Sequence, residues 1–212
     1  MKARLLSPLV ALLFLIPGCV GSAAASAVDA MSAAETAAKG WNENANLAQA
    51  MAIEGTFPAM LLSAMGESSR DFSRSEGDET IGDGLAEVWA YRYVADGAST
   101  AYLVVVDRDD TILREETTPL RPEDAPLAAW SLDSDDALEK ALAANDALAS
   151  GVARDQYGIV AILHSEEGRT EWLVAGGGAD DLGAGGGMVR LDAQSGEIIA
   201  TQGGFREGAT GF

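Results

Sequence analysis

Three prolines, Pro119, Pro122 and Pro126, interrupt the chain near its middle, and the patterns on their two sides follow the same order. Proline has no backbone N–H and its ring obstructs a helix, so neither a helix interior nor an inner strand fits this segment. On each side, a stretch with helical periodicity comes first and short alternating stretches follow. This order predicts two units, residues 29–118 and 127–202, joined by a linker over residues 119–126.

Helical periodicity leads the first unit. Apolar residues recur alternately three and four apart from Met31 to Ala52, which predicts one face of an amphipathic helix that begins after Asp29. Residues 66–84 are polar and predict a loop. Strict alternation over residues 87–94 predicts a strand, and after turns we expect further strands over residues 100–106 and 111–114.

The second unit repeats this order. A helix is predicted from a cap at Asp133 or Ser134 to Gly151, followed by strands over residues 157–164, 170–175, 188–192 and 197–199, with a glycine-rich loop over residues 176–187. We therefore predict an α+β fold of two tandem units, each a helix packed on an antiparallel β-meander of three to four strands. Residues 203–212 are predicted to form a tail.

The N-terminus predicts export. A basic start precedes an apolar stretch over residues 5–16, which is shorter than the roughly 20 residues of a membrane-spanning helix and has the length of a signal-peptide core. The following Ile16-Pro17-Gly18-Cys19 resembles the bacterial lipobox, although Pro17 departs from the residues usual there. The resemblance implies cleavage after Gly18 and diacylglycerol on the Cys19 thiol.

We accordingly expect a signal peptide over residues 1–18, a flexible tether over residues 19–28, and a cell-membrane location with a lipid anchor on the extracytoplasmic face. The alternative is an ordinary signal peptide cleaved near Ala25 or Ala27, which would remove Cys19 from the mature chain.

Charge and cysteine content restrict the partners and the fold. The chain has 14 basic and 33 acidic residues and a formal charge of −19, which repels nucleic-acid phosphates and anionic lipid headgroups. We expect no nucleic-acid partner, and membrane attachment has to be covalent or hydrophobic. Cys19 is the only cysteine, so no intramolecular disulfide supports the fold.

The closing strands suggest a family. The segment Val189-Arg190-Leu191-Asp192-Ala193-Gln194-Ser195-Gly196-Glu197-Ile198 matches the strand-turn-strand that closes a PepSY-type domain, and residues 105–112 are similar to it without the glycine. With the helix-then-strands order, the resemblance covers most of residues 29–118 and 127–202. It implies tandem PepSY-like repeats in a prokaryotic lipoprotein: extracytoplasmic, non-catalytic modules that hold or inhibit peptidases or bind other envelope components. The family has no catalytic residues to carry over.

Little in the sequence points to an enzyme. The single histidine, His164, is predicted to lie on a strand at the edge of a hairpin, and no Gly-x-Ser-x-Gly nucleophile motif occurs. The acid clusters at residues 107–110 and 133–136 contain oxygen ligands that suit calcium, yet they are typical of a β-turn and a helix cap. We expect no catalysis, no cofactor and no metal, with a calcium-dependent binder or an acid-rich hydrolase as an alternative.

The aromatic row Trp89, Tyr91 and Tyr93 is the candidate partner surface. If the predicted helix covers this strand face, the three rings are core; if the face is open, they suit a protein or peptide partner. The expected function is a lipid-anchored binding or regulatory module without catalysis, held to the membrane by Cys19 and contacting a protein or peptide. The alternative is a peptidase inhibitor or a chaperone-like envelope protein.

Overall fold

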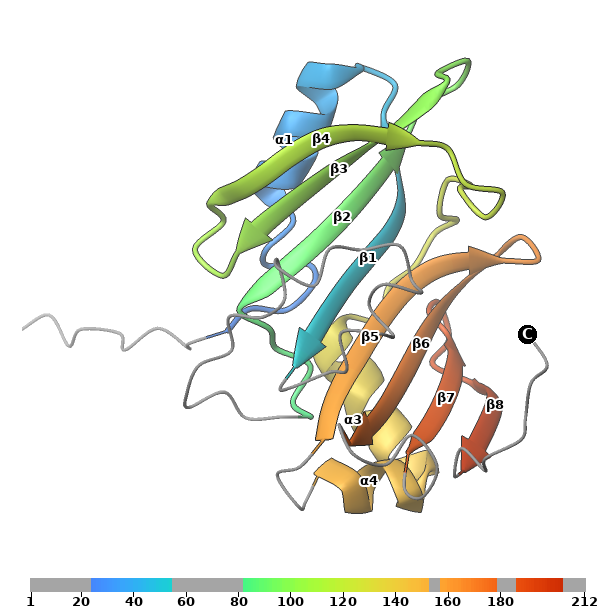
Figure 1. Cartoon of the computed structure of the whole chain (residues 1–212). Helices are drawn as coiled ribbons and strands as arrows, with labels where there is room; N and C mark the ends of the chain where they lie inside the picture. The colour runs from blue at the N-terminus through green and yellow to red at the C-terminus, as the bar shows by residue number, and fades with distance from the viewer. Residues whose placement is uncertain (1–23, 55–81, 153–156, 179–185, 204–212) are drawn as a thin grey trace, which may run out of the picture.

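A computed structural model describes residues 24–54, 82–152, 157–178 and 186–203 of the chain (Figure 1). Its helices and strands follow one another as α1 Ser32–Trp41, β1 Asn46–Glu54, β2 Val88–Val94, β3 Thr100–Asp107, β4 Ile112–Pro119, α3 Ser134–Ala144, α4 Asp146–Val152, β5 Tyr157–Glu166, β6 Arg169–Gly178, β7 Gly187–Asp192 and β8 Ile198–Gly203. The strands predicted between residues 87 and 199 are confirmed. The predicted signal peptide, most of the loop over residues 66–84 and most of the tail lie outside the described residues.

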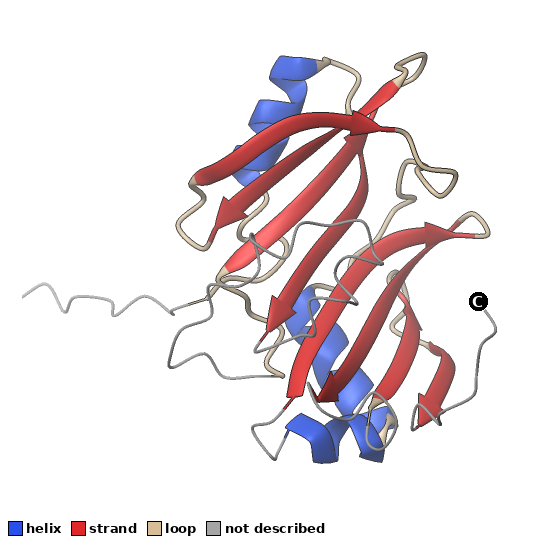
Figure 2. Cartoon of the chain, viewed as in Figure 1, coloured by secondary structure: helices blue, strands red, loops and turns tan. Residues whose placement is uncertain are grey.

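All eight described strands belong to one antiparallel sheet with the order β4-β3-β2-β1-β5-β6-β7-β8 (Figure 2). The prediction of an α+β fold with two helix-plus-meander units is therefore wrong, and the fold is mainly β. The two halves join where β1 pairs with β5 over six positions from Gln49↔His164 to Glu54↔Ile159. This pairing satisfies backbone groups that would otherwise form two additional sheet edges.

The first predicted helix is too long. Helix α1 ends at Trp41, the next residue Asn42 has an extended backbone, and the alanine-rich stretch that continued the helical period forms β1. Alanine favours a helix in isolation, but its small side chain also fits a strand that is paired on both sides. Here β2 and β5 flank β1, and these long-range pairings override the local preference.

The three described helices pack on the same face of the sheet (Figure 1), with α1 against β3 and α3 and α4 mainly against β6 and β7. One buried apolar cluster extends beneath them across both halves of the chain. At its centre, Trp89 of β2 meets Trp172 of β6 edge to face, with ring centroids 6.4 Å apart. The two halves of the chain therefore share one hydrophobic core as well as one sheet.

The helix termini show how local sequence places these elements. Asp133 is the N-cap of α3, as predicted, and accepts a 2.7 Å hydrogen bond from the Ser134 N–H. Asp29 does not cap α1; the Ala33 N–H instead donates to Asp110 Oδ1 at 2.8 Å, from the turn between β3 and β4. The second predicted helix divides at Asn145, whose Oδ1 accepts from the first N–H groups of α4.

Candidate functional site

A row of polar residues crosses the sheet face on which no described helix packs. Cross-strand pairing places Arg92 of β2 opposite Gln49 of β1, Gln49 opposite His164 of β5, His164 opposite Glu171 of β6, and Glu171 opposite Asp192 of β7. Directly paired residues project from the same side of a sheet, so these five positions form one continuous line, here called the polar row.

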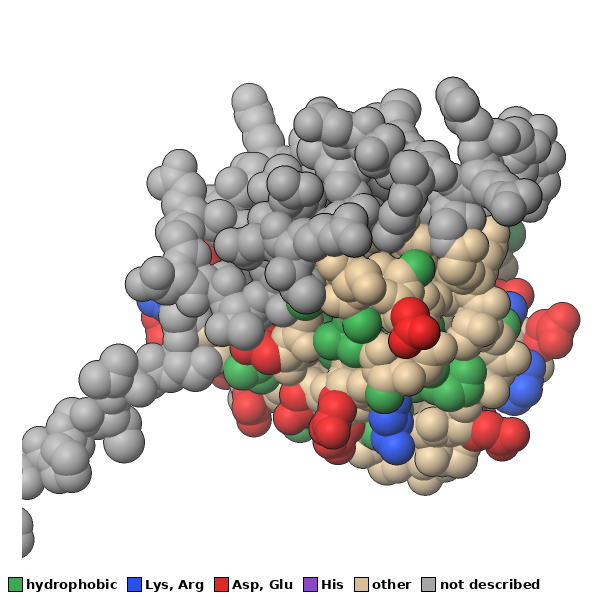
Figure 3. Space-filling model, turned by 90° about the horizontal axis from the view of Figure 1, so that it is seen from below, with side chains coloured by type: hydrophobic (Ala, Val, Ile, Leu, Met, Phe, Trp, Pro, Cys, Tyr) green, Lys and Arg blue, Asp and Glu red, His purple; other side chains and the backbone are tan. Residues whose placement is uncertain are grey.

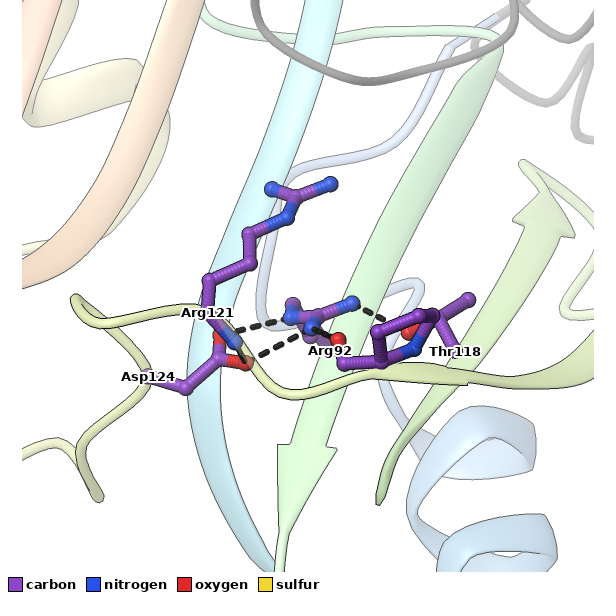
Figure 4. Close-up of polar contacts among 5 residues, drawn as sticks. Arg92, Thr118, Arg121 and Asp124 are labelled. Atoms are coloured by element: carbon purple, nitrogen blue, oxygen red, sulfur yellow. Dashed lines mark hydrogen bonds and ion pairs between the residues drawn. The ribbon is translucent and has the colours of Figure 1, made fainter. Parts of the chain in front are cut away.

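Arg92 anchors one end of the polar row. Its side chain is 2% exposed, and its Nε and Nη2 donate to the two carboxylate oxygens of Asp124, each at 2.6 Å (Figure 4). Nη2 also donates to the Pro119 carbonyl at 2.6 Å, and Nη1 donates to the Thr118 hydroxyl. Because these partners lie at the end of β4 and in the proline segment, Arg92 fixes the predicted linker against the sheet.

The electrostatics of this pair follow from its contacts. Burial by itself would raise the pKa of the Asp124 carboxyl, but hydrogen bonds from the Arg92 guanidinium and the Arg121 N–H, together with the positive charges of both arginines, lower that pKa below its ordinary value. Asp124 is therefore held as a carboxylate, and the buried Arg92 cation is neutralised by a two-point contact.

A second buried carboxylate occupies the other side of the row. Glu171 is fully buried; its Oε2 accepts from Arg190 Nε at 2.9 Å and lies 2.7 Å from Arg190 Nη2. Its Oε1 lies 3.3 Å from Arg169 Nη2. The Arg190 and Arg169 side chains are 30% and 50% exposed. The two arginines thus neutralise a carboxylate that would be costly to bury alone.

His164 lies between these two charge clusters. It occupies the inner strand β5, paired with β1 and β6, so its predicted position at a hairpin edge is wrong. Burial lowers its pKa; the charges of Glu166 and Glu171 oppose that shift and Arg190 adds to it. Its Nε2 is buried without a hydrogen-bond partner among the residues that the structure describes. Because its pKa is lowered from the ordinary value of 6.5, the ring is neutral near pH 7.

The polar row was missed by the sequence reasoning. Arg92 lies between Tyr91 and Tyr93 in a strand whose other side chains are apolar or aromatic. Glu171 directly precedes an apolar run that begins at Trp172. A charged residue inside a strand of this kind is the signal that could have marked each position. The partner of Arg92 could not have been named, because Asp124 is 32 residues away along the chain.

The candidate partner surface lies in the core. Trp89, Tyr91 and Tyr93 are 1%, 0% and 3% exposed, so the structure places the aromatic row beneath the helices. The Trp89 Nε1 donates to the Ala25 carbonyl at 2.8 Å, and the Tyr91 hydroxyl donates to the Ala27 carbonyl at 2.6 Å. These rings hold the N-terminal segment to the sheet and present no surface to a partner.

Cys19 lies outside the described residues, but the chain is packed soon after it. Ala25 and Ala86 exchange two backbone hydrogen bonds of 3.0 and 2.9 Å, and Ala27 and Ala30 are fully buried. The folded part thus begins before the end of the predicted tether at residue 28. Six residue steps separate Cys19 from Ala25, a reach of at most about 22 Å.

The acid clusters considered for calcium have structural roles. Asp107 Oδ1 accepts from the N–H groups of Asp109 and Thr111 at 3.0 and 2.8 Å, which closes the β3–β4 turn. Asp110 and Asp133 bond the starts of α1 and α3. Within the described part of the chain, no group of three or more His, Cys, Asp or Glu side chains is arranged to hold a metal ion.

Comparisons with known proteins found a similar solved structure but no matching family. No family model and no curated protein sequence matches it, so the PepSY-type resemblance stays a prediction. Among solved structures, it is similar to a putative lipoprotein from Clostridium difficile 630, with a TM-score of 0.48 and 14% identity, over 80% of this chain and 90% of that one. The likeness concerns the backbone path, and no function is carried over from it. None of the helices that the structure describes is long and apolar enough to cross a membrane.

Proposed function

We propose that this chain is a lipid-anchored envelope protein whose folded part binds a protein or peptide on the outer side of the membrane, without catalysis. The observation that carries the proposal is Pro17-Gly18-Cys19 directly after the twelve-residue apolar stretch that ends at Ile16, with the folded part already bridged at Ala25. A lipid on Cys19 would place Ala25 within about 22 Å of its anchor point.

The charge of the chain favours a covalent anchor as the means of stable attachment. With residues 1–18 removed, 12 basic and 33 acidic residues remain, so anionic headgroups repel the body of the protein. A single acyl chain supports only marginal membrane binding, whereas two chains on one residue give stable anchoring. Diacylglycerol on the Cys19 thiol therefore supplies what the protein surface does not.

The binding role is supported by the construction of the sheet. The buried contacts of Arg92 with Asp124 and of Glu171 with Arg190 hold neighbouring elements in a defined arrangement, which favours recognition by a rigid surface. The sheet also ends in exposed strands, whose backbone groups can pair with another chain.

Expression of the full chain in a bacterium that processes lipoproteins tests the anchor. Intact mass and detergent-phase partition are measured for the wild-type protein, for Cys19→Ser, and for Ser22→Ala as a matched change outside the cleavage motif. We expect a mature chain that begins at residue 19 with added lipid mass, in wild type and Ser22→Ala but not in Cys19→Ser. A soluble chain that begins beyond Cys19 in all three proteins would refute the anchor.

A further inference from the structure

The sheet ends at two edge strands that differ in chemistry. Strand β4 carries Arg114, Glu115 and Glu116 and ends in Pro119, which are the charges and the proline that natural sheets use to discourage further pairing. Strand β8 reads Ile198-Ile199-Ala200-Thr201-Gln202-Gly203, without charge or proline, and five of its six residues are exposed. Of the two edge strands in the described part of the chain, only β8 lacks these charges and the proline.

Strand β8 is held in place from its inner side. Asn145 is 6% exposed, and its Nδ2 donates to the Gln202 carbonyl at 3.0 Å and to the Met188 carbonyl at 3.4 Å. Its Oδ1 accepts from the N–H groups of Ala147 and Leu148, at the start of α4. One buried amide thus joins a helix start to the last two strands, so an incoming strand meets an ordered edge and the entropy cost of binding is smaller.

The charge of the molecule indicates which kind of segment pairs with the β8 edge. At a formal charge of −19, a second copy is repelled and a positively charged segment is attracted. Figure 3 shows acidic side chains spread over the described surface seen from below, with fewer basic ones. The position of the edge also suits a partner, because β8 is five strands from β2, next to which the N-terminal segment joins the fold. At about 4.8 Å per strand, the edge lies about 24 Å from that attachment.

We propose that the outer edge of β8, with which no described strand pairs, takes a ninth, antiparallel or parallel strand from an extended, positively charged segment of a partner protein. The proposal rests on the proposed binding function and names its surface. Backbone hydrogen bonds to β8 supply the contact, and the acidic body supplies the preference for lysine- and arginine-rich segments.

A labelled, capped decapeptide of alternating valine and lysine is the probe, titrated by fluorescence anisotropy against the full-length lipidated protein in a non-ionic detergent. Thr201→Lys adds a charge on β8, and Thr117→Lys makes the same change on β4, at a residue that is also exposed. We expect Thr201→Lys to weaken binding at least about tenfold and Thr117→Lys to change it less than about twofold. N-methylation of alternate peptide amides, which removes strand pairing and keeps the charge, is expected to weaken binding equally strongly.

Hydrogen–deuterium exchange provides a second measurement, with new protection expected in residues 198–203 when the peptide binds. Equal losses in both variants, or full binding of the N-methylated peptide, would show diffuse charge attraction and overturn the proposal. Three other results would also overturn the proposal: equal binding of a valine–glutamate peptide, absence of any binding, and dimerisation that Thr201→Lys abolishes. Lipid mass and membrane partition of the same sample report the anchor separately, so failure at the β8 edge and failure of the anchor are distinguishable.

Discussion

Replacement of Asp124 by asparagine tests the polar row most directly. The substitution preserves side-chain volume and one acceptor oxygen but removes the charge that faces Arg92. Both side chains are nearly inaccessible, at 2% and 4% exposure. Removing one partner of such a pair leaves an uncompensated buried charge, which costs about 3–5 kcal/mol. Because the amide oxygen still accepts one hydrogen bond, we expect Asp124→Asn to cost about 3 kcal/mol, at the low end of that range.

The assay is urea unfolding followed by circular dichroism, with Asp109→Asn as the control. Asp109 contacts Arg108 at 3.9 Å with an 80% exposed side chain, so its charge should contribute under about 1 kcal/mol. Replacing both partners, as Arg92→Met with Asp124→Leu, should recover much of the loss, because no buried charge then remains. A cost below about 1 kcal/mol for Asp124→Asn would refute the argument that the pair is buried and coupled.

The same pair predicts a pH dependence. The folded-state pKa of Asp124 is lowered, so its contribution to stability is fully present above its unfolded pKa of about 3.9 and is lost as pH falls through the lower folded value. Asp124→Asn has no such titration. The difference in unfolding free energy between wild type and variant should therefore narrow below about pH 4; a constant difference would contradict the assigned direction.

Three further predictions concern other positions. Burial lowers the folded-state pKa of His164, so the unfolded chain takes up the proton first as the pH falls. The urea concentration at the unfolding midpoint should therefore decrease as the pH drops below about 6.5 in wild type, and it should decrease less in His164→Gln. Equal pH profiles of the two proteins would contradict the lowered pKa. Gly84 has φ +77°, and an added Cβ would overlap the backbone of Ser134 and Asp135, so Gly84→Ala should cost more than about 2 kcal/mol by urea unfolding, against about 1 kcal/mol for Gly97→Ala, which has φ +75° and open space; similar costs would contradict the overlap. Asn145→Ala should cost about 2–3 kcal/mol in unfolding free energy and speed amide exchange in α4 and β8. As a control, Asn46→Ala, which removes one exposed local hydrogen bond, should cost under about 0.5 kcal/mol. Unchanged amide exchange in β8 of Asn145→Ala would show that Asn145 does not hold this strand.

Much of the local structure could be predicted from residue patterns. Strict alternation located β2 because side chains of a strand project to opposite faces, and Asp133 located the start of α3 because its side chain satisfies a free N–H. Strand β1 was assigned to a helix because alanine at helical spacing carries no strand signal of its own. The aromatic row was recognised, but its pattern could not decide between core and surface.

The sequence by itself determined where most strands lie, the charge of −19, the absence of disulfides and the lipobox-like segment before Cys19. The tertiary structure alone decided that two halves form one sheet, that Trp89, Tyr91 and Tyr93 are buried, and that Arg92 meets Asp124. The physical reason is range. Periodicity and caps act within a few residues, whereas β1 pairs with a strand more than 100 residues away, and its partner is set by which arrangement satisfies backbone groups and buries both halves under one set of helices.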